Sequence, residues 1–185
     1  AEGQLLGIAS AAPALAEAIP YALEKGFDFM LLDGTRGIEN FGVELEGGYD
    51  LAIMRDAIKI LRSLNREESL RLLYYGGLRT GTDVAKVLGM NCQAGVFSLA
   101  MGFALGGVVR DGRLRFEENG GAEELAAAGR NWIKAASQEA AIIARCAGKT
   151  NVHNLEPEDM RAITLATSKA LGIPLAAGRG ARGYF

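Results

Sequence analysis

The chain has 185 residues, of which 49% are hydrophobic and 23% are charged, and its formal net charge is −2. This balance is typical of a globular protein, and it gives neither the basic surface that binds nucleic acid nor an apolar stretch that could span a membrane. The two cysteines, Cys92 and Cys146, stand far apart, which favours a reducing, cytoplasmic compartment and excludes an iron–sulfur cluster or metal site built from these cysteines alone.

Short apolar runs alternate with helical stretches along the chain, which is the pattern of parallel β/α units. The predicted strands cover residues 5–9, 27–32, 70–75 and 93–96. The predicted helices cover residues 14–25, 50–65, 82–88, 122–147 and 156–171. A closed β/α barrel has eight such units in about 250 residues, so the sequence predicts an α/β fold with about half of a (β/α)8 TIM-barrel.

The pattern divides the chain into a half-barrel at residues 1–109, a helical extension at 110–177 and a flexible tail at 178–185. Residues 110–121 are polar and contain glycine, so we expect a loop there. Half a barrel leaves open strand edges, and such edges pair readily with other strands. We therefore expect a second polypeptide, or a second copy of the chain, to complete the barrel, unless the chain is a fragment of a longer protein.

The stretch YYGGLRTGTDVAK, residues 74–86, is the most informative for function. A strand ends at Gly76 and Gly77, where backbone amides can approach a ligand without interference from a Cβ atom. Thr80 and Asp83 fit a capping box at the start of the next helix. Free amides beside the positive end of a helix favour an anion, typically a phosphate. The alternative interpretation is a tight turn that binds nothing.

Two segments carry a family resemblance. GGLRTGTDVAK, residues 76–86, resembles the phosphate-binding strand and helix of FMN-dependent barrels such as glutamate synthase, IMP dehydrogenase and the 2-hydroxy acid oxidases. CAGKTNVHNLEPEDMRAIT, residues 146–164, is similar to the segment that follows the barrel in glutamate synthase-like proteins, including the flavin subunit of N-methylglutamate synthase. The resemblance spans residues 27–177 and the C-terminal half of that family's FMN domain.

The resemblance implies FMN as the cofactor, oxidoreductase chemistry in glutamate or amino-nitrogen metabolism, and an amidotransferase as a possible partner. It identifies no catalytic residue and no metal ligand. Arg79 could pair with a phosphate or a substrate carboxylate, or it could simply lie in solvent. The implied cofactor-binding residues are Asp33, Gly34, Gly76, Gly77, Arg79, Thr80, Gly81 and Ser98.

Three departures from the family keep a second hypothesis open. The strand at residues 5–9 carries no lysine where the family has one near the flavin, and the turn after Gly34 lacks the family's glycine-rich pattern. Phe97 stands where the family has a glycine that helps to hold the phosphate. These differences favour a flavin-free interaction or regulatory subunit that has kept the barrel fold. We expect Trp132 to anchor packing and the single histidine, His153, to be structural.

Overall fold

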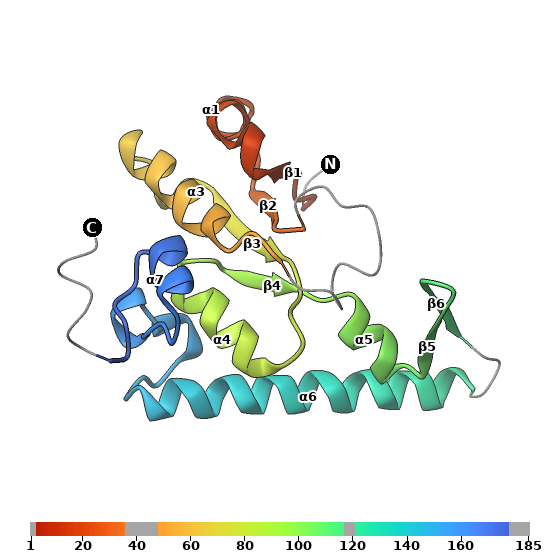
Figure 1. Cartoon of the computed structure of the whole chain (residues 1–185). Coiled ribbons are helices and arrows are strands. Elements are labelled where there is room, and N and C mark those ends of the chain that lie inside the picture. Colours follow the sequence, from red (N-terminus) through yellow and green to blue (C-terminus); the bar gives the residue numbers. More distant parts are fainter. Residues whose placement is uncertain (1–2, 36–47, 117–120, 178–185) are drawn as a thin grey trace.

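The computed structural model describes residues 3–35, 48–116 and 121–177 (Figure 1). The strands are β1 (Gly7–Ala11), β2 (Phe29–Asp33), β3 (Arg71–Tyr75), β4 (Ala94–Val96), β5 (Gly107–Arg110) and β6 (Arg113–Phe116). The helices are α1 (Leu15–Lys25), α3 (Ala52–Ser63), α4 (Gly81–Gly89), α5 (Leu99–Ala104), α6 (Ala122–Cys146) and α7 (Leu165–Leu171). Short 3-10 turns lie at Ala12–Ala14, Val152–Asn154 and Pro157–Asp159.

Strands β1 to β4 form one parallel sheet in chain order, and a helix connects each strand to the next (Figure 1). This is the arrangement of consecutive units in a β/α barrel, so the predicted fold class is confirmed. In the part of the chain that the structure describes, β1 and β4 each pair on one side only. β1 begins at Gly7, two residues later than the predicted strand.

The two faces of the sheet differ in burial. Alternate side chains of β2 and β3 are at most 1% exposed and belong to the main core with α1 and α3; these are Met30, Leu32, Leu72 and Tyr74. The side chains between them are only half-buried; these are Phe29, Leu31, Leu73 and Tyr75. In a closed barrel the second face would be covered by the remaining strands.

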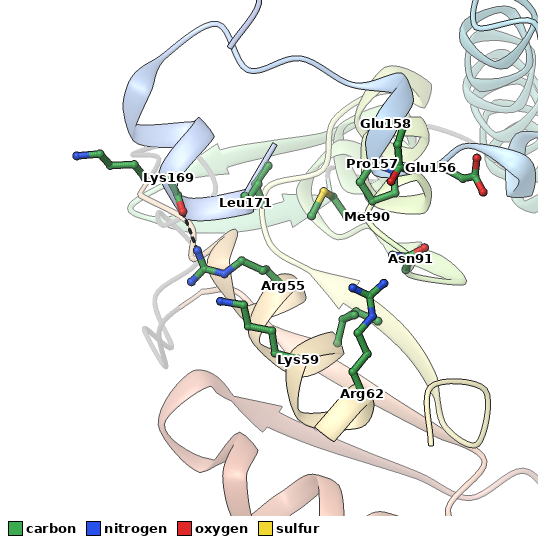
Figure 2. A pocket seen from close by; sticks show the side chains of 12 residues that line it. Arg55, Lys59, Arg62, Met90, Asn91, Glu156, Pro157, Glu158, Lys169 and Leu171 are labelled. Carbon is green, nitrogen blue, oxygen red and sulfur yellow. Dashed lines mark hydrogen bonds between the residues drawn. The ribbon is translucent and has the colours of Figure 1, made fainter. Parts of the chain in front are cut away.

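Helix α3 packs between the sheet and the C-terminal segment. Its buried side chains, Ile53, Met54, Ala57 and Leu61, recur at helical spacing and form the stripe that faces the core. On the outer side, Arg55 Nη1 donates a hydrogen bond to the Lys169 carbonyl oxygen at 2.6 Å (Figure 2). This bond holds the last turn of α7 against α3, where a cation is favourable because the helix ends there.

The predicted loop at residues 110–121 is wrong in its first half. Residues 107–116 form the antiparallel hairpin β5–β6, and the short helix α5, which the sequence analysis did not predict, precedes it. The hairpin turns at Asp111 and Gly112, whose φ angles are 52° and 68°. Asp-Gly is a favoured pair for such two-residue turns because both positions need a positive φ. The predicted boundary at 109/110 falls inside β5, and the division into three parts stays a prediction; the predicted tail at residues 178–185 lies outside the described residues.

The single helix predicted at residues 156–171 is also wrong. Its first residues form only a 3-10 turn, in which the Glu156 amide donates to Asp159 Oδ2 at 3.0 Å. The chain then becomes extended because the Ala162 amide donates to the Pro174 carbonyl at 2.8 Å, which pairs the two segments. Helix α7 starts only after Thr164, whose side chain caps it. Lys149 pairs with two acids of the turn, Glu156 and Asp159, and these hydrogen bonds raise its pKa.

Candidate functional site

Predicted cofactor residues from three strands meet at the carboxyl edge of the sheet. Gly34 follows β2, Gly76 follows β3 and Ser98 follows β4. The Gly34 amide donates to the Tyr75 carbonyl at 2.7 Å, and the Tyr75 hydroxyl lies 3.5 Å from Ser98 Oγ. Ligands of barrels and of open α/β sheets bind at this edge, so the location suits a cofactor.

Asp33 is engaged in the turn that follows β2. Its Oδ1 atom accepts hydrogen bonds from the Thr35 amide at 2.9 Å and from the Thr35 hydroxyl at 2.6 Å. Aspartate commonly stabilises a turn in this way through its own backbone neighbours. The structure therefore gives Asp33 a role in shaping this edge, and its predicted contact with a cofactor stays a prediction.

The glycines after β3 are needed for close packing. A Cβ atom on Gly76 would lie 2.7 Å from the Tyr74 hydroxyl oxygen. Gly77 has a φ of 66°, and a Cβ atom there would overlap the ring of Tyr49. Tyr74 is fully buried, and this burial, with a further contribution from Asp50, raises the pKa of its hydroxyl. The neutral, buried side chain of Tyr74 therefore packs against the turn and fixes its position.

The next backbone groups of this turn are available to a ligand. The amides of Gly77 and Leu78 donate to no acceptor among the described residues, although Leu78 is only 6% exposed. Buried amides in proteins are nearly always paired, and successive free amides form a concavity that binds anions. The turn therefore fits a phosphate group.

Gly77 and Leu78 line a cavity of about 330 Å³. Its walls are Gly77, Leu78, Arg79, Leu99, Ala100, Phe103 and Trp132. Trp132 also packs edge-on against Phe97, with 4.6 Å between the ring centroids, which confirms its predicted role as a packing anchor. The sequence analysis missed the wall from α5 because it did not predict that helix. The volume is at the small end of ligand pockets and suits a phosphate with part of its carrier.

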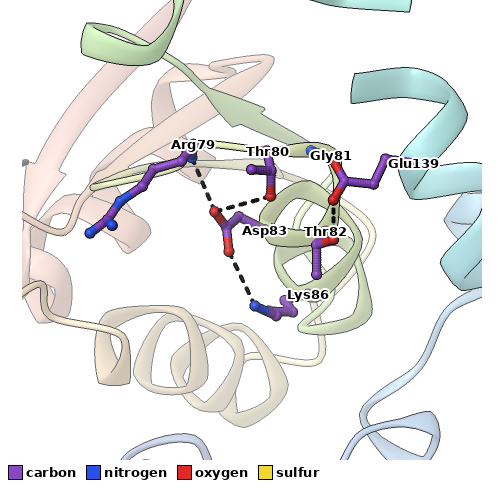
Figure 3. Close-up of polar contacts among 7 residues, drawn as sticks. All are labelled: Arg79, Thr80, Gly81, Thr82, Asp83, Lys86 and Glu139. Atoms are coloured by element: carbon purple, nitrogen blue, oxygen red, sulfur yellow. Dashed lines mark hydrogen bonds and ion pairs between the residues drawn. The ribbon is translucent and has the colours of Figure 1, made fainter. Parts of the chain in front are cut away.

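The amino end of α4 lies beside this turn, and a carboxylate from α6 binds it (Figure 3). The Gly81 amide donates to Glu139 Oε2 at 2.9 Å, and the Thr82 hydroxyl donates to Oε1 at 2.5 Å. A Cβ atom on Gly81 would overlap the carbonyl oxygen of Ala136, so this glycine permits the close approach of the two helices. The roles of Thr80 and Gly81 in holding a cofactor stay predictions, while Gly77 and Leu78 offer the free amides.

The predicted capping box at Thr80 and Asp83 is wrong, although the helix does begin there. Asp83 Oδ2 accepts from the Arg79 amide at 3.1 Å instead of the Thr80 amide, and the Thr80 side chain caps no helix amide. The Asp83 carboxylate also pairs with Lys86 at 3.1 Å. The Arg79 side chain is exposed and extends away from Glu139 (Figure 3). Its guanidinium pairs with no described residue, and Arg79 is one of the residues that line the cavity.

Within residues 3–35, 48–116 and 121–177, no three His, Cys, Asp or Glu side chains gather as a metal site. No helix in that part of the chain is long and apolar enough to cross a membrane. Cys146 is exposed, whereas Cys92 is buried, and burial raises the pKa of the Cys92 thiol to about 12.

Comparison with known proteins agrees with this geometry. Over 192 residues the chain is 32% identical to a glutamate synthase large subunit-like protein of Rhizobium meliloti (strain 1021), covering 84% of this chain and 42% of that protein. It therefore spans less than half the length of the curated relative. No protein-family profile matches the chain.

Solved structures of flavocytochrome b2 share the fold. A variant with sulfite bound superposes with a TM-score of 0.57 at 18% identity, covering 83% of this chain and 35% of that one. A variant with pyruvate bound gives a TM-score of 0.54 at 19% identity, covering 80% and 33%. Sequence and fold together identify the chain as a relative of the glutamate synthase large subunit-like proteins, with the fold of part of a β/α barrel.

Proposed function

We propose that the chain supplies the phosphate-binding half of an FMN site in a glutamate synthase-like oxidoreductase. The observation that carries this proposal is the turn after β3, where Gly77, Leu78 and Arg79 line a cavity. The amides of Gly77 and Leu78 and the guanidinium of Arg79 have no partner among the described residues. Bound FMN would supply the electron-transfer chemistry, and the protein would hold and orient it. Gly77, Leu78 and Arg79 would bind the phosphate, while Asp33, Gly34 and Ser98 would border the flavin at the same edge.

The same proposal includes a partner that completes the barrel. Both outer strands of the parallel sheet have an unpaired edge in the described part of the chain, and one sheet face is only half-buried. Unpaired edges and half-covered apolar faces favour association with further strands. A second polypeptide or a second copy of this chain would cover both, and would bury the flavin ring that this half leaves exposed.

The proposal is tested by titrating the chain with FMN and with riboflavin, which lacks the phosphate, while flavin fluorescence is recorded. Because the phosphate donors belong to this chain, FMN should bind and riboflavin should bind at least about tenfold more weakly. Arg79→Gln should weaken FMN binding, whereas Lys134→Gln, which removes an exposed charge from α6, should not. A flavin-free interaction or regulatory subunit that has kept the barrel fold would bind neither FMN nor riboflavin.

A further inference from the structure

A second cavity lies in the outer helical layer, between α3 and the C-terminal segment. Its volume is about 570 Å³, within the range of small-molecule pockets. Arg62 from the last turn of α3 and Asn91, which precedes β4, both line it (Figure 2). The cavity therefore lies toward the amino ends of the strands, whereas the proposed flavin residues follow the carboxyl ends.

One face of α3 brings three cations to this cavity. Arg55, Lys59 and Arg62 are spaced by four and three residues, so they lie on adjacent turns of the same helix face. Figure 2 shows the Arg62 guanidinium rising toward Asn91, with Lys59 between Arg62 and Arg55. A helix face with this spacing presents its charges to a common ligand.

The three cations differ in what they already bind. Each nitrogen of the Arg55 guanidinium is already engaged, because Nε and Nη2 donate to Asp56 Oδ1 at 3.0 and 2.8 Å and Nη1 donates to the Lys169 carbonyl. It fixes the wall of the cavity. The side chains of Lys59 and Arg62 make no hydrogen bond and no ion pair with any residue that the structure describes. Two cations are therefore available to a ligand.

The acidic residues of the cavity do not neutralise these cations. Glu156 pairs with Lys149 at 3.0 Å. The Glu158 carboxylate forms no ion pair within the described part of the chain. It also lines the cavity, where its negative charge would repel an anionic ligand. Apolar side chains, including Ile58, Met90 and Leu171, form the remaining wall. The cavity thus has positively charged side chains from α3 on one wall and apolar side chains on another.

We propose that this cavity binds the phosphate group of a small phosphorylated molecule through Lys59 and Arg62. A guanidinium fork matches two phosphate oxygens, an ammonium adds a point charge, and the Asn91 amide can donate a further hydrogen bond. The apolar wall would contact the rest of the molecule. The site is independent of the proposed flavin function, since Lys59 and Arg62 line neither of the two cavities that Arg79 lines.

The test is isothermal titration calorimetry of the chain with inorganic phosphate and with phenyl phosphate, at constant ionic strength because exposed charges are screened by salt. Both should bind, and phenyl phosphate should bind more tightly because its ring meets the apolar wall. Lys59→Gln and Arg62→Gln should each weaken binding about tenfold. Glu158→Gln should tighten it, because a repelling charge is removed, and the exposed Lys134→Gln control should leave it unchanged.

The side chains of Lys59 and Arg62 are exposed and make no hydrogen bond or ion pair with a described residue, so their substitution should leave the circular dichroism spectrum unchanged. The proposal is overturned if no saturable phosphate binding occurs, or if binding occurs only in the Glu158→Gln variant, which would show that Glu158 closes the cavity. Binding abolished by Arg79→Gln but not by Arg62→Gln would also overturn it, because the phosphate would then occupy the flavin edge. Loss of FMN binding alone would leave this proposal standing.

Discussion

Glu139 and Gly81, 58 residues apart, are joined by a hydrogen bond of 2.9 Å from the Gly81 amide to the Glu139 carboxylate. The same carboxylate accepts from the Thr82 hydroxyl, so both oxygens are used. A negative side chain at the amino end of a helix satisfies free amides and interacts favourably with the helix dipole. The bond therefore holds α6 against α4 and fixes the start of α4, directly after the turn proposed to bind phosphate.

Replacing Glu139 by alanine should destabilise the fold. The substitution leaves the partly buried Gly81 amide and Thr82 hydroxyl without their acceptor, which costs about 1–3 kcal/mol of unfolding free energy. Urea unfolding measures the loss. The matched control is Glu124→Ala, an exposed acid in the first turn of the same helix, which should cost less than about 1 kcal/mol. Equal losses in both variants would show that the α4–α6 bond contributes no specific stability.

Two helical glycines should respond to alanine with opposite signs. A Cβ atom on Gly81 would lie 2.8 Å from the Ala136 carbonyl carbon and 2.9 Å from the Ala140 nitrogen, so Gly81→Ala should lose about 1–3 kcal/mol. On Gly129 the nearest atom would be Leu105 Cδ2 at 3.4 Å, so Gly129→Ala should gain about 0.5–1 kcal/mol from helix propensity. Thermal unfolding of both variants checks the pair. A stable Gly81→Ala variant would contradict the close helix contact.

The buried thiol of Cys92 should make the protein less stable in alkali. Burial raises its pKa from 9.0 to about 12, so the folded state keeps the proton more firmly than the unfolded chain does. The contribution to stability is therefore complete below pH 9.0 and is lost as the pH rises toward 12. Between neutral pH and about pH 10 the loss should be about 1 kcal/mol, measured by urea unfolding.

The control for this prediction is a comparison of the two cysteines. Cys92→Ala should remove this part of the alkaline loss, whereas Cys146→Ala should keep it because Cys146 is exposed. A thiol reagent at mildly alkaline pH should modify Cys146 in the folded protein and Cys92 only after unfolding. An unchanged alkaline loss in Cys92→Ala would assign the effect to other groups.

Local patterns in the sequence were sufficient to predict the β/α units. The runs at residues 27–32 and 70–75 are almost wholly apolar, as expected of strands in a buried parallel sheet, and the structure places β2 and β3 there. The hairpin was also readable, since Asp111-Gly112 stands between short runs rich in valine, arginine and leucine, but the polar composition of this stretch was interpreted as a loop. The short helix α5, at Leu99–Ala104, was missed separately, and with it one wall of the proposed phosphate cavity.

The remaining features depend on contacts between distant residues. Pro157, Glu158 and Asp159 resemble a helix start, but pairing of Ala162 with Pro174 keeps the following residues extended. Likewise, nothing near Gly81 in the sequence indicates that Glu139 binds its amide. The residues of the carboxyl edge could be selected from a family resemblance, whereas the free amides of the turn became visible only in the folded chain.

Whether this chain holds the phosphate of FMN is tested most directly by native mass spectrometry of the purified chain mixed with FMN or, in a parallel sample, with riboflavin. The proposal predicts one bound FMN per completed barrel, no retained riboflavin, and a partner or second copy in the same complex. An assembled complex that retains neither flavin, or retains both equally, would contradict the proposed phosphate site.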